Sequence, residues 1–187
     1  MAMLLLTLRG TPFFFAGDEI GMAKVPIPPE AIQDVFEKLV PGYGLNRDPE
    51  RSPMRWDATC NGGFTSGRPW LPMGDDIGEI NVSRLQQDRH SLLWLYRSLI
   101  ELRRSEPALV AGAYRPIRSR NDLLMFKRVD AKTQLLIALN FGADPRRVTF
   151  EGRATLLLST QLDRNPAPFP SPSILRENEG VVLRLTD

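Results

Sequence analysis

The stretch "SLLWLYRSLIELRRSEPAL" (residues 91–109) is the most regular in the chain. Its apolar residues recur every three or four positions, which is the spacing of one face of an α-helix. Ser91 can cap the start of such a helix, arginines occupy its last turn, and Pro107 follows its end. The pattern predicts a helix over residues 91–105 that packs one face against a core.

From about residue 112 onward the pattern changes to short β-type runs separated by turn signals. Regularly spaced short strands with tight turns are typical of an antiparallel sheet or sandwich. The proline-rich segment "NPAPFPSPS" (165–173) is expected to be a loop in that sheet. The runs are "AYRPIRS", "DLLMFKRV", "QLLIALNF", "RRVTF", "ATLLLS" and "VVLRL".

Before the helix, the chain opens with "MAMLLLTLRG", which is typical of the last turns of a helix stopped by Gly10. The apolar run Thr11–Ala16 predicts a strand buried on both faces, as in a parallel sheet, and Gly17 permits a sharp exit. A parallel strand needs parallel neighbours joined by crossover helices. The following residues offer none, so we expect the partners of this strand to lie outside the chain.

Residues 28–81 combine one short helix with a long irregular stretch. The segment "PPEAIQDVFEKLV" (28–40) predicts an amphipathic helix with its apolar side chains on one face. Residues 41–81 are rich in Gly, Pro, Asp, Asn and Arg, yet include Trp56 and Trp70. Such a loop is uncommon unless it is functional or disordered, and its apolar anchors disfavour disorder.

Composition excludes several classes of function. The formal net charge is +2 and the arginines are scattered among acids, so neither a nucleic acid nor a membrane is an expected partner. Cys60 is the only cysteine, which makes an oxidising compartment unnecessary, and we expect a cytoplasmic protein. His90 is the only histidine, which excludes a Ser-His-Asp hydrolase and a His-rich metal site. We expect no metal and no cofactor.

Two pairs of carboxylates could carry acid–base chemistry. Asp18 and Glu19 are adjacent at the end of the predicted strand, so their side chains diverge, and structural hydrogen bonding is favoured over ligand contact. Asp34 and Glu37 lie one helical turn apart, and a solvated helix face is the favoured interpretation.

The segment "GLNRDPERSPMRWD" (44–57) offers a better candidate. The rigid donor fork of Arg47, beside Asp48, could hold neighbouring sugar hydroxyls, with Trp56 or Trp70 as an apolar wall. In the alternative, the charged residues only pair with one another and pin a long loop. The spacing leaves both interpretations open.

Several long motifs occur in the order of a known family. They are "LLLTLRGTPFFFAGDEIGM", "PPEAIQDVFEKLVPGYGLNRDPERSPMRWD", "GGFTSGRPWLP", "INV" and "SLLWLYRSLIELRRSEPALVAGAY". From residue 4 to about 114 the chain resembles the C-terminal part of bacterial α-glucosidases. These are glycoside hydrolase family 13 enzymes of the α-amylase superfamily, in the oligo-1,6-glucosidase and α-1,4-glucosidase group. The resemblance is looser through the β-rich part.

The resemblance implies a fragment of a (β/α)8 TIM barrel followed by an antiparallel β-sandwich. Residues 1–111 would be the C-terminal portion of the catalytic barrel, with its last strand at Thr11–Ala16 and a long substrate-side loop at 41–81. Residues 112–187 would form an all-β C-terminal domain. A whole barrel takes about 250 residues, which agrees with the interpretation as a fragment.

The resemblance also implies a retaining mechanism with an aspartate nucleophile, a glutamate acid/base and a second aspartate in an Asn-His-Asp motif. All three precede "TLRGTP" in the family, and no such motif occurs here. The full-length enzyme would release glucose from the non-reducing ends of α-linked gluco-oligosaccharides. This chain would lack catalytic residues, would need an N-terminal barrel portion as partner, and would be inactive alone.

One family role carries over to residues of this chain. An arginine in the motif matching "RDPERSPM" lies at the non-reducing-end glucose subsite, and we assign it to Arg47, with Arg51 as second choice. Asn46 stands where glycine is common in the family. The rivals are a non-catalytic β-domain interaction module and the C-terminal half of a split glycosidase or glucosyltransferase. These residues do not show whether the enzyme prefers α-1,4 or α-1,6 linkages. They also do not show whether it hydrolyses its substrate or transfers a glucosyl group.

Overall fold

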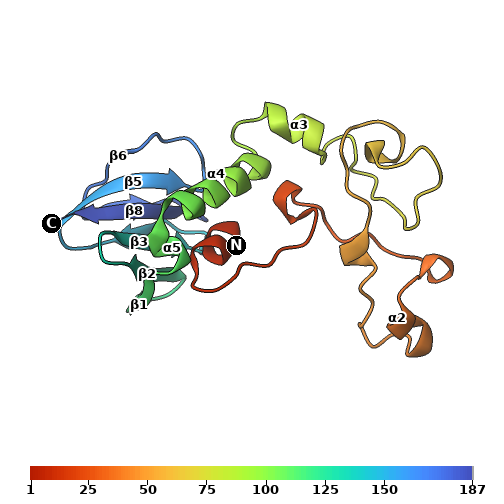
Figure 1. Ribbon diagram of the computed structural model, residues 1–187, viewed down its shortest axis with the longest axis horizontal. Coiled ribbons are helices and arrows are strands. Elements are labelled where there is room, and N and C mark those ends of the chain that lie inside the picture. Colours follow the sequence, from red (N-terminus) through yellow and green to blue (C-terminus); the bar gives the residue numbers. More distant parts are fainter. Residues whose placement is uncertain (187) are drawn as a thin grey trace. The chain divides into compact units, whose positions relative to one another are not determined.

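The computed structural model describes residues 1–186 and groups them into two compact units. One unit combines Met1–Phe13 with the chain from Leu95 onward, and the other is Phe14–Trp94. Figure 1 shows the strands gathered in the first unit and mostly irregular backbone in the second. The predicted division into residues 1–111 and 112–187 stays a prediction about domains.

The first unit is built on antiparallel β-structure. Six strands form one sheet in the order β1-β2-β3-β8-β5-β6, and β4 pairs with β7 in a two-stranded sheet. The strands are β1 (Ala113–Ile117), β2 (Leu123–Val129), β3 (Gln134–Asn140), β4 (Arg146–Val148), β5 (Arg153–Ser159), β6 (Ala167–Pro168), β7 (Ser173–Leu175) and β8 (Gly180–Thr186).

Both faces of the six-stranded sheet are covered by apolar side chains. Leu135 and Ile137 of β3 belong to a cluster with α1 (Ala2–Thr7), α5 (Pro107–Val110) and the part of α4 (Leu92–Ser105) that follows Trp94. Leu136 and Ala138 lie on the opposite face, with side chains from β4 and β7. Successive strand residues point to opposite faces, so a strand covered on both sides is apolar throughout, as "LLIAL" is.

The structure confirms the six predicted β-runs and the predicted helix, which spans Leu92–Ser105. It adds two short strands, β6 and β7, in and just after the proline-rich segment expected to be a loop. The expected sandwich forms only in part, because the second layer is the two-stranded β4-β7 sheet.

The strand predicted at Thr11–Ala16 is not formed in the described chain, which agrees with the prediction that this chain does not provide its strand partners. Residues 11–15 have no strand assignment, and Phe13 is 82% exposed and Phe15 62% exposed. A strand exists only through its hydrogen bonds to a neighbouring strand. No strand among residues 1–186 runs beside this segment, so its phenylalanine side chains remain exposed.

Two arginines hold the end of α1 in place. The fully buried Arg128 of β2 donates to the carbonyl of Thr7 at 2.6 Å, and Arg103 of α4 donates to the carbonyls of Leu6 and Leu8. Helix carbonyls at a C-terminus lack intrahelical donors, and cations are favoured beside them. Burial lowers the pKa of Arg128. The α1 helix confirms the prediction for the opening residues.

Besides the first three residues of α4, the second unit contains only short helical turns. They are η1 (Asp18–Ile20), η2 (Pro29–Ala31), α2 (Val35–Leu39), η3 (Pro49–Arg51), η4 (Cys60–Gly63) and α3 (Val82–Gln87). The helix predicted over residues 28–40 is therefore broken into η2 and α2. The apolar side of α2 does not pack on a core within this unit, since Val35 is 63% and Leu39 74% exposed.

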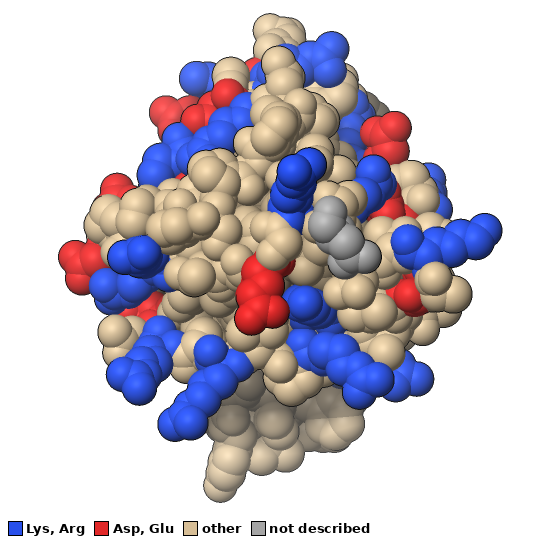
Figure 2. All heavy atoms as spheres, turned by 90° about the vertical axis from the view of Figure 1, so that its left-hand side faces the viewer, with Lys and Arg blue, Asp and Glu red and all other residues tan. Residues whose placement is uncertain are grey.

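No helix within residues 1–186 is long and apolar enough to cross a membrane. Figure 2 shows lysine and arginine side chains spread among acidic and uncharged ones on the side of the molecule that it displays.

Candidate ligand-binding site

Asp34 is the centre of the polar structure that holds the 44–57 segment. It is 1% exposed, although the sequence favoured a solvated helix face, so that interpretation is wrong. Its Oδ1 accepts from the N–H of Phe36 at 2.8 Å and caps α2. Its Oδ2 lies 2.7 Å from Nε of Arg47 and 3.4 Å from a terminal nitrogen of Arg51. The hydrogen bond from Arg47 is the main reason that the pKa of Asp34 falls to about 2.

Asp48 fixes the same loop through backbone donors. It is fully buried, and its Oδ2 accepts from the N–H of Gln33 at 2.7 Å and of Asp34 at 2.9 Å. The side chain of Asn46 accepts from the N–H of Asp48 at 2.9 Å. Two carboxylates thereby join residues 46–51 to residues 33–36, which are distant in sequence.

Arg47 is anchored on one edge and open on the other. Its Nε is occupied by Asp34, and its guanidinium carbon lies 5.1 Å from the centre of the Phe36 ring. The two terminal NH2 groups have no hydrogen-bond partner within residues 1–186, and the side chain is 53% exposed. The ion pairs that pin the loop therefore exist, and they leave Arg47 with free donors in a fixed position.

Arg47 lines a cavity of about 470 Å³. Lys24 and Glu50 line it and form an ion pair of 2.7 Å, in which Lys24 lowers the pKa of Glu50. Among the described residues, the second oxygen of Glu50 and one oxygen of Asp48 are buried without a hydrogen-bond partner. The lining consists of Phe15, Lys24, Gly44, Leu45, Asn46, Arg47, Glu50 and Arg51.

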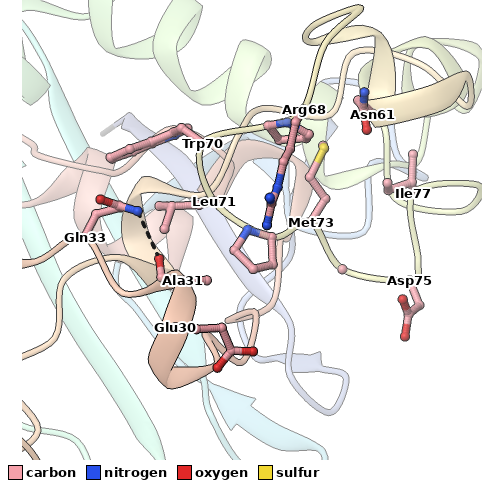
Figure 3. Close-up of a pocket in the computed structure, with 13 residues that line it drawn as sticks. Glu30, Ala31, Gln33, Asn61, Arg68, Trp70, Leu71, Met73, Asp75 and Ile77 are labelled. Atoms are coloured by element: carbon pink, nitrogen blue, oxygen red, sulfur yellow. Dashed lines mark hydrogen bonds between the residues drawn. The ribbon is translucent and has the colours of Figure 1, made fainter.

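The expected tryptophan wall is not part of this cavity. Neither Trp56 nor Trp70 lines it, and its apolar surface comes from Phe15 and Leu45. Trp70 instead lines a separate cavity of about 830 Å³ (Figure 3). The sequence could not show this, because the backbone turns between residues 56 and 70 decide where each indole lies.

Asp18 and Glu19 have the structural role that the sequence favoured. Asp18 accepts from the N–H of Phe15 at 2.9 Å, and Glu19 accepts from the N–H of Gly17 at 2.8 Å. Gly17 has a φ of 102°, which confirms that the sharp exit needs a glycine. Asp18 also lines a cavity of about 260 Å³ that shares Lys24 and Glu50 with the Arg47 cavity.

The carboxylates around Arg47 suit binding rather than proton transfer. A general acid needs a raised pKa, whereas the pKa shifts of Asp34 and Glu50 are both downward because each accepts from a cation. No group of residues within 1–186 has the histidine, cysteine and carboxylate clustering of a metal site. The site therefore offers fixed donors and ionised acceptors beside an aromatic ring.

Comparison with known proteins decides the family. The model of the alpha-amylase catalytic domain matches residues 1–112. The chain belongs to the alpha-amylase family. The oligo-1,6-glucosidase of Halalkalibacterium halodurans is 36% identical over 177 residues, which cover 85% of this chain and 31% of that protein. The trehalose-6-phosphate hydrolase of Escherichia coli is 31% identical and covers 74% of this chain and 28% of its own length.

Solved structures of this alpha-amylase family agree with the assignment. The trehalulose synthase MutB from Pseudomonas mesoacidophila MX-45 matches with a TM-score of 0.84 at 31% identity, covering 99% of this chain and 37% of its own. Such structures are TIM-barrel enzymes. The chain thus spans about a third of the length of the relatives that it matches.

Proposed function

We propose that this alpha-amylase family chain is the C-terminal part of a retaining α-glucosidase and that Arg47 holds the non-reducing-end glucose of an α-linked gluco-oligosaccharide. The supporting observation is that Asp34 fixes Nε of Arg47 while its terminal donors stay free and the side chain lines a cavity. Arg51, which reaches the same carboxylate at 3.4 Å, is the second ligand in this proposal.

A sugar suits this arrangement better than a charged ligand. The guanidinium fork can donate to two neighbouring hydroxyl oxygens, and ionised Glu50 can accept from another hydroxyl. The ring of Phe15 offers an apolar surface for the C–H face of a pyranose. Because Asp34 already balances Arg47, the site needs no anionic ligand to neutralise it.

We further propose that the chain alone does not hydrolyse glycosides. Retaining hydrolysis requires a nucleophilic carboxylate and a protonated carboxyl about 5 Å apart. The carboxylates nearest the Arg47 cavity bind cations or backbone N–H groups instead. The missing partner in this proposal is an N-terminal barrel portion that supplies the catalytic carboxylates.

The direct test is to incubate the purified chain with p-nitrophenyl α-glucoside. We expect no release of nitrophenol above the buffer control. Hydrolysis that persists through repurification and co-elutes with the chain would contradict the proposal of an inactive chain.

The role of Arg47 is tested by glucose binding, measured by saturation-transfer NMR on the full chain. Arg47→Ala should weaken binding about tenfold, since one charge-assisted pair of hydrogen bonds is lost. Arg84→Ala is the matched control, because Arg84 is exposed in the same unit and its side chain donates only to the carbonyl of Gly78. An equal loss of glucose affinity in both variants would show that Arg47 does not bind the sugar.

A glucosyl-transferring enzyme is the second candidate function. The similarity to a trehalulose synthase supports it, because that relative is as similar to the chain as several hydrolases are. Supplying the barrel portion in trans and measuring glucose release against glucosyl transfer would separate the two. A non-catalytic interaction module would show neither activity.

A further inference from the structure

A second polar cavity in the Phe14–Trp94 unit shares no lining residue with the Arg47 cavity. It has a volume of about 830 Å³ and lies between the turn around η2 and the segment 68–77 (Figure 3). That volume is in the range of pockets that hold a small ligand. We name it the Trp70 cleft, defined by Glu30, Gln33, Asn61, Arg68, Trp70 and Asp75.

The walls of the Trp70 cleft are held by contacts of their own. Leu71 is 1% exposed and anchors the 68–77 segment. The methyl group of Met73 packs so closely on Gly62 that a Cβ there would lie only 3.0 Å from it. The side-chain amide of Asn61 donates to the carbonyls of Thr65 and Gly67, which fixes the adjoining turn. Contacts within the protein therefore hold the walls of the cleft in place.

The three charged side chains of the cleft and its indole are unpaired, whereas Gln33 and Asn61 donate to backbone carbonyls. Glu30, Arg68 and Asp75 form no ion pair or hydrogen bond within residues 1–186, and the indole N–H of Trp70 has no partner there. Elsewhere in the same unit, Lys24, Glu50 and the residues around Asp34 are paired. The cleft therefore presents donors and acceptors that no other described side chain uses.

Trp70 is 51% exposed, and Figure 3 shows Trp70, Arg68 and Met73 in the upper part of the view and Glu30 in the lower part. An exposed indole offers a flat apolar face, which packs against the C–H face of a pyranose. Arg68 donates and Glu30 accepts, which matches hydroxyl groups that do both. One cation and two carboxylates line the cleft, so an anionic ligand would meet net repulsion.

We propose that the Trp70 cleft is a second carbohydrate site that binds a neutral gluco-oligosaccharide, with Trp70 as the stacking platform and Arg68 and Glu30 as hydroxyl ligands. This second site goes beyond the function proposed for the Arg47 cavity, because the two cavities share no lining residue. An enzyme with two separate glucose-binding surfaces holds a chain-like substrate at both and raises its local concentration.

The test uses the full chain labelled with 5-fluorotryptophan, which gives one fluorine NMR signal for each of its three tryptophans. Titration with maltose and isomaltose should shift the Trp70 signal and leave those of Trp56 and Trp94 in place. Single Trp→Phe variants assign the signals. No shift of the Trp70 signal at high millimolar sugar, or a shift of the Trp56 signal instead, would overturn the proposal.

Variants then separate the two sites. Arg68→Ala and Glu30→Gln should each raise the sugar concentration at the midpoint of the Trp70 titration about tenfold. Arg47→Ala should leave this midpoint unchanged. Trp56→Ala is the matched control, because Trp56 is exposed to the same degree, at 52%, outside the cleft. If Arg47→Ala abolishes the Trp70 shift, the sugar binds at the Arg47 cavity and the second site does not exist. If Arg47 does not bind sugar, the Trp70 signal should still shift on titration, so the two proposals can fail independently.

Discussion

The two compact units are stabilised by different physical means. Of the buried apolar side chains, only Ile20, Val25, Leu71 and Leu93 lie in Phe14–Trp94, so apolar burial alone cannot hold that unit together. The other described unit has two continuous apolar clusters, one on each face of its sheet. Both proposed sugar sites lie in the polar unit, whose irregular loops are fixed mainly by polar contacts.

The largest expected effect tests the apolar unit. Leu136→Ala removes a fully buried side chain of β3 and should lower the free energy of unfolding of the sheet by about 2–5 kcal/mol. The matched control is Ile174→Ala on β7, whose side chain is 56% exposed, and it should change stability by less than about 0.5 kcal/mol. Urea unfolding followed by far-ultraviolet circular dichroism measures both. Equal losses would show that burial does not decide stability there.

The next effect tests the polar unit. Asp34→Asn keeps the shape of the side chain but removes the charge that binds Arg47 and Arg51. We expect severalfold faster proteolytic cleavage between residues 40 and 52, because the loop loses its anchor. Glu37→Gln on the same helix is the control. Amide exchange in β3 should not change, and a parallel change there would mean that the two units are not stabilised independently.

Acid should loosen the polar unit through Asp34. Its folded pKa of about 2 lies below the ordinary value of 3.8, so its contribution is fully present above pH 3.8 and is lost as the pH falls through 2. The amide resonance of Phe36, whose N–H donates to Asp34, should titrate with a midpoint near 2. In Asp34→Asn the resonance should show no such midpoint. A midpoint near 3.8 in the natural chain would contradict the ion pair.

The smallest effect concerns the Lys24–Glu50 pair. The side chain of Lys24 is 77% exposed, and exposed ion pairs contribute little. Lys24→Ala should therefore leave the thermal unfolding midpoint nearly unchanged, and added salt should abolish any difference. A large loss of stability would show that the cavity beside this pair depends on it.

Prediction from sequence succeeded where neighbours in sequence decide the structure. The helix at residues 91–105 and the six β-runs follow from periodicity. The sharp turn at Gly17 follows from the presence of a glycine there. The interpretation of Asp34 failed because its partners are 13 and 17 residues away along an irregular loop. The strand at Thr11–Ala16 is not formed because a strand depends on a neighbour that the described chain does not provide.

The positions of the side chains proposed to bind sugar also could not be predicted from the sequence. The residue types of "GLNRDPERSPMRWD" indicated a choice between a pinned loop and a ligand surface, and the structure shows that Arg47 is pinned through Nε while its other donors stay free. Its role in binding sugar stays a prediction. The Trp70 cleft had no signal in the sequence, because its walls come from residues 30–33, 61 and 68–77.

By itself the sequence determined the helix at residues 91–105, the six β-runs and the family resemblance, because these depend on residue order and on local spacing. Only the tertiary structure decided that Asp34 is buried between two arginines and that Trp70 lies in a cavity apart from Arg47. The physical reason is that irregular loops have no periodicity. Their side chains meet through turns whose hydrogen bonds, such as those of Asp48, form only when distant segments come together.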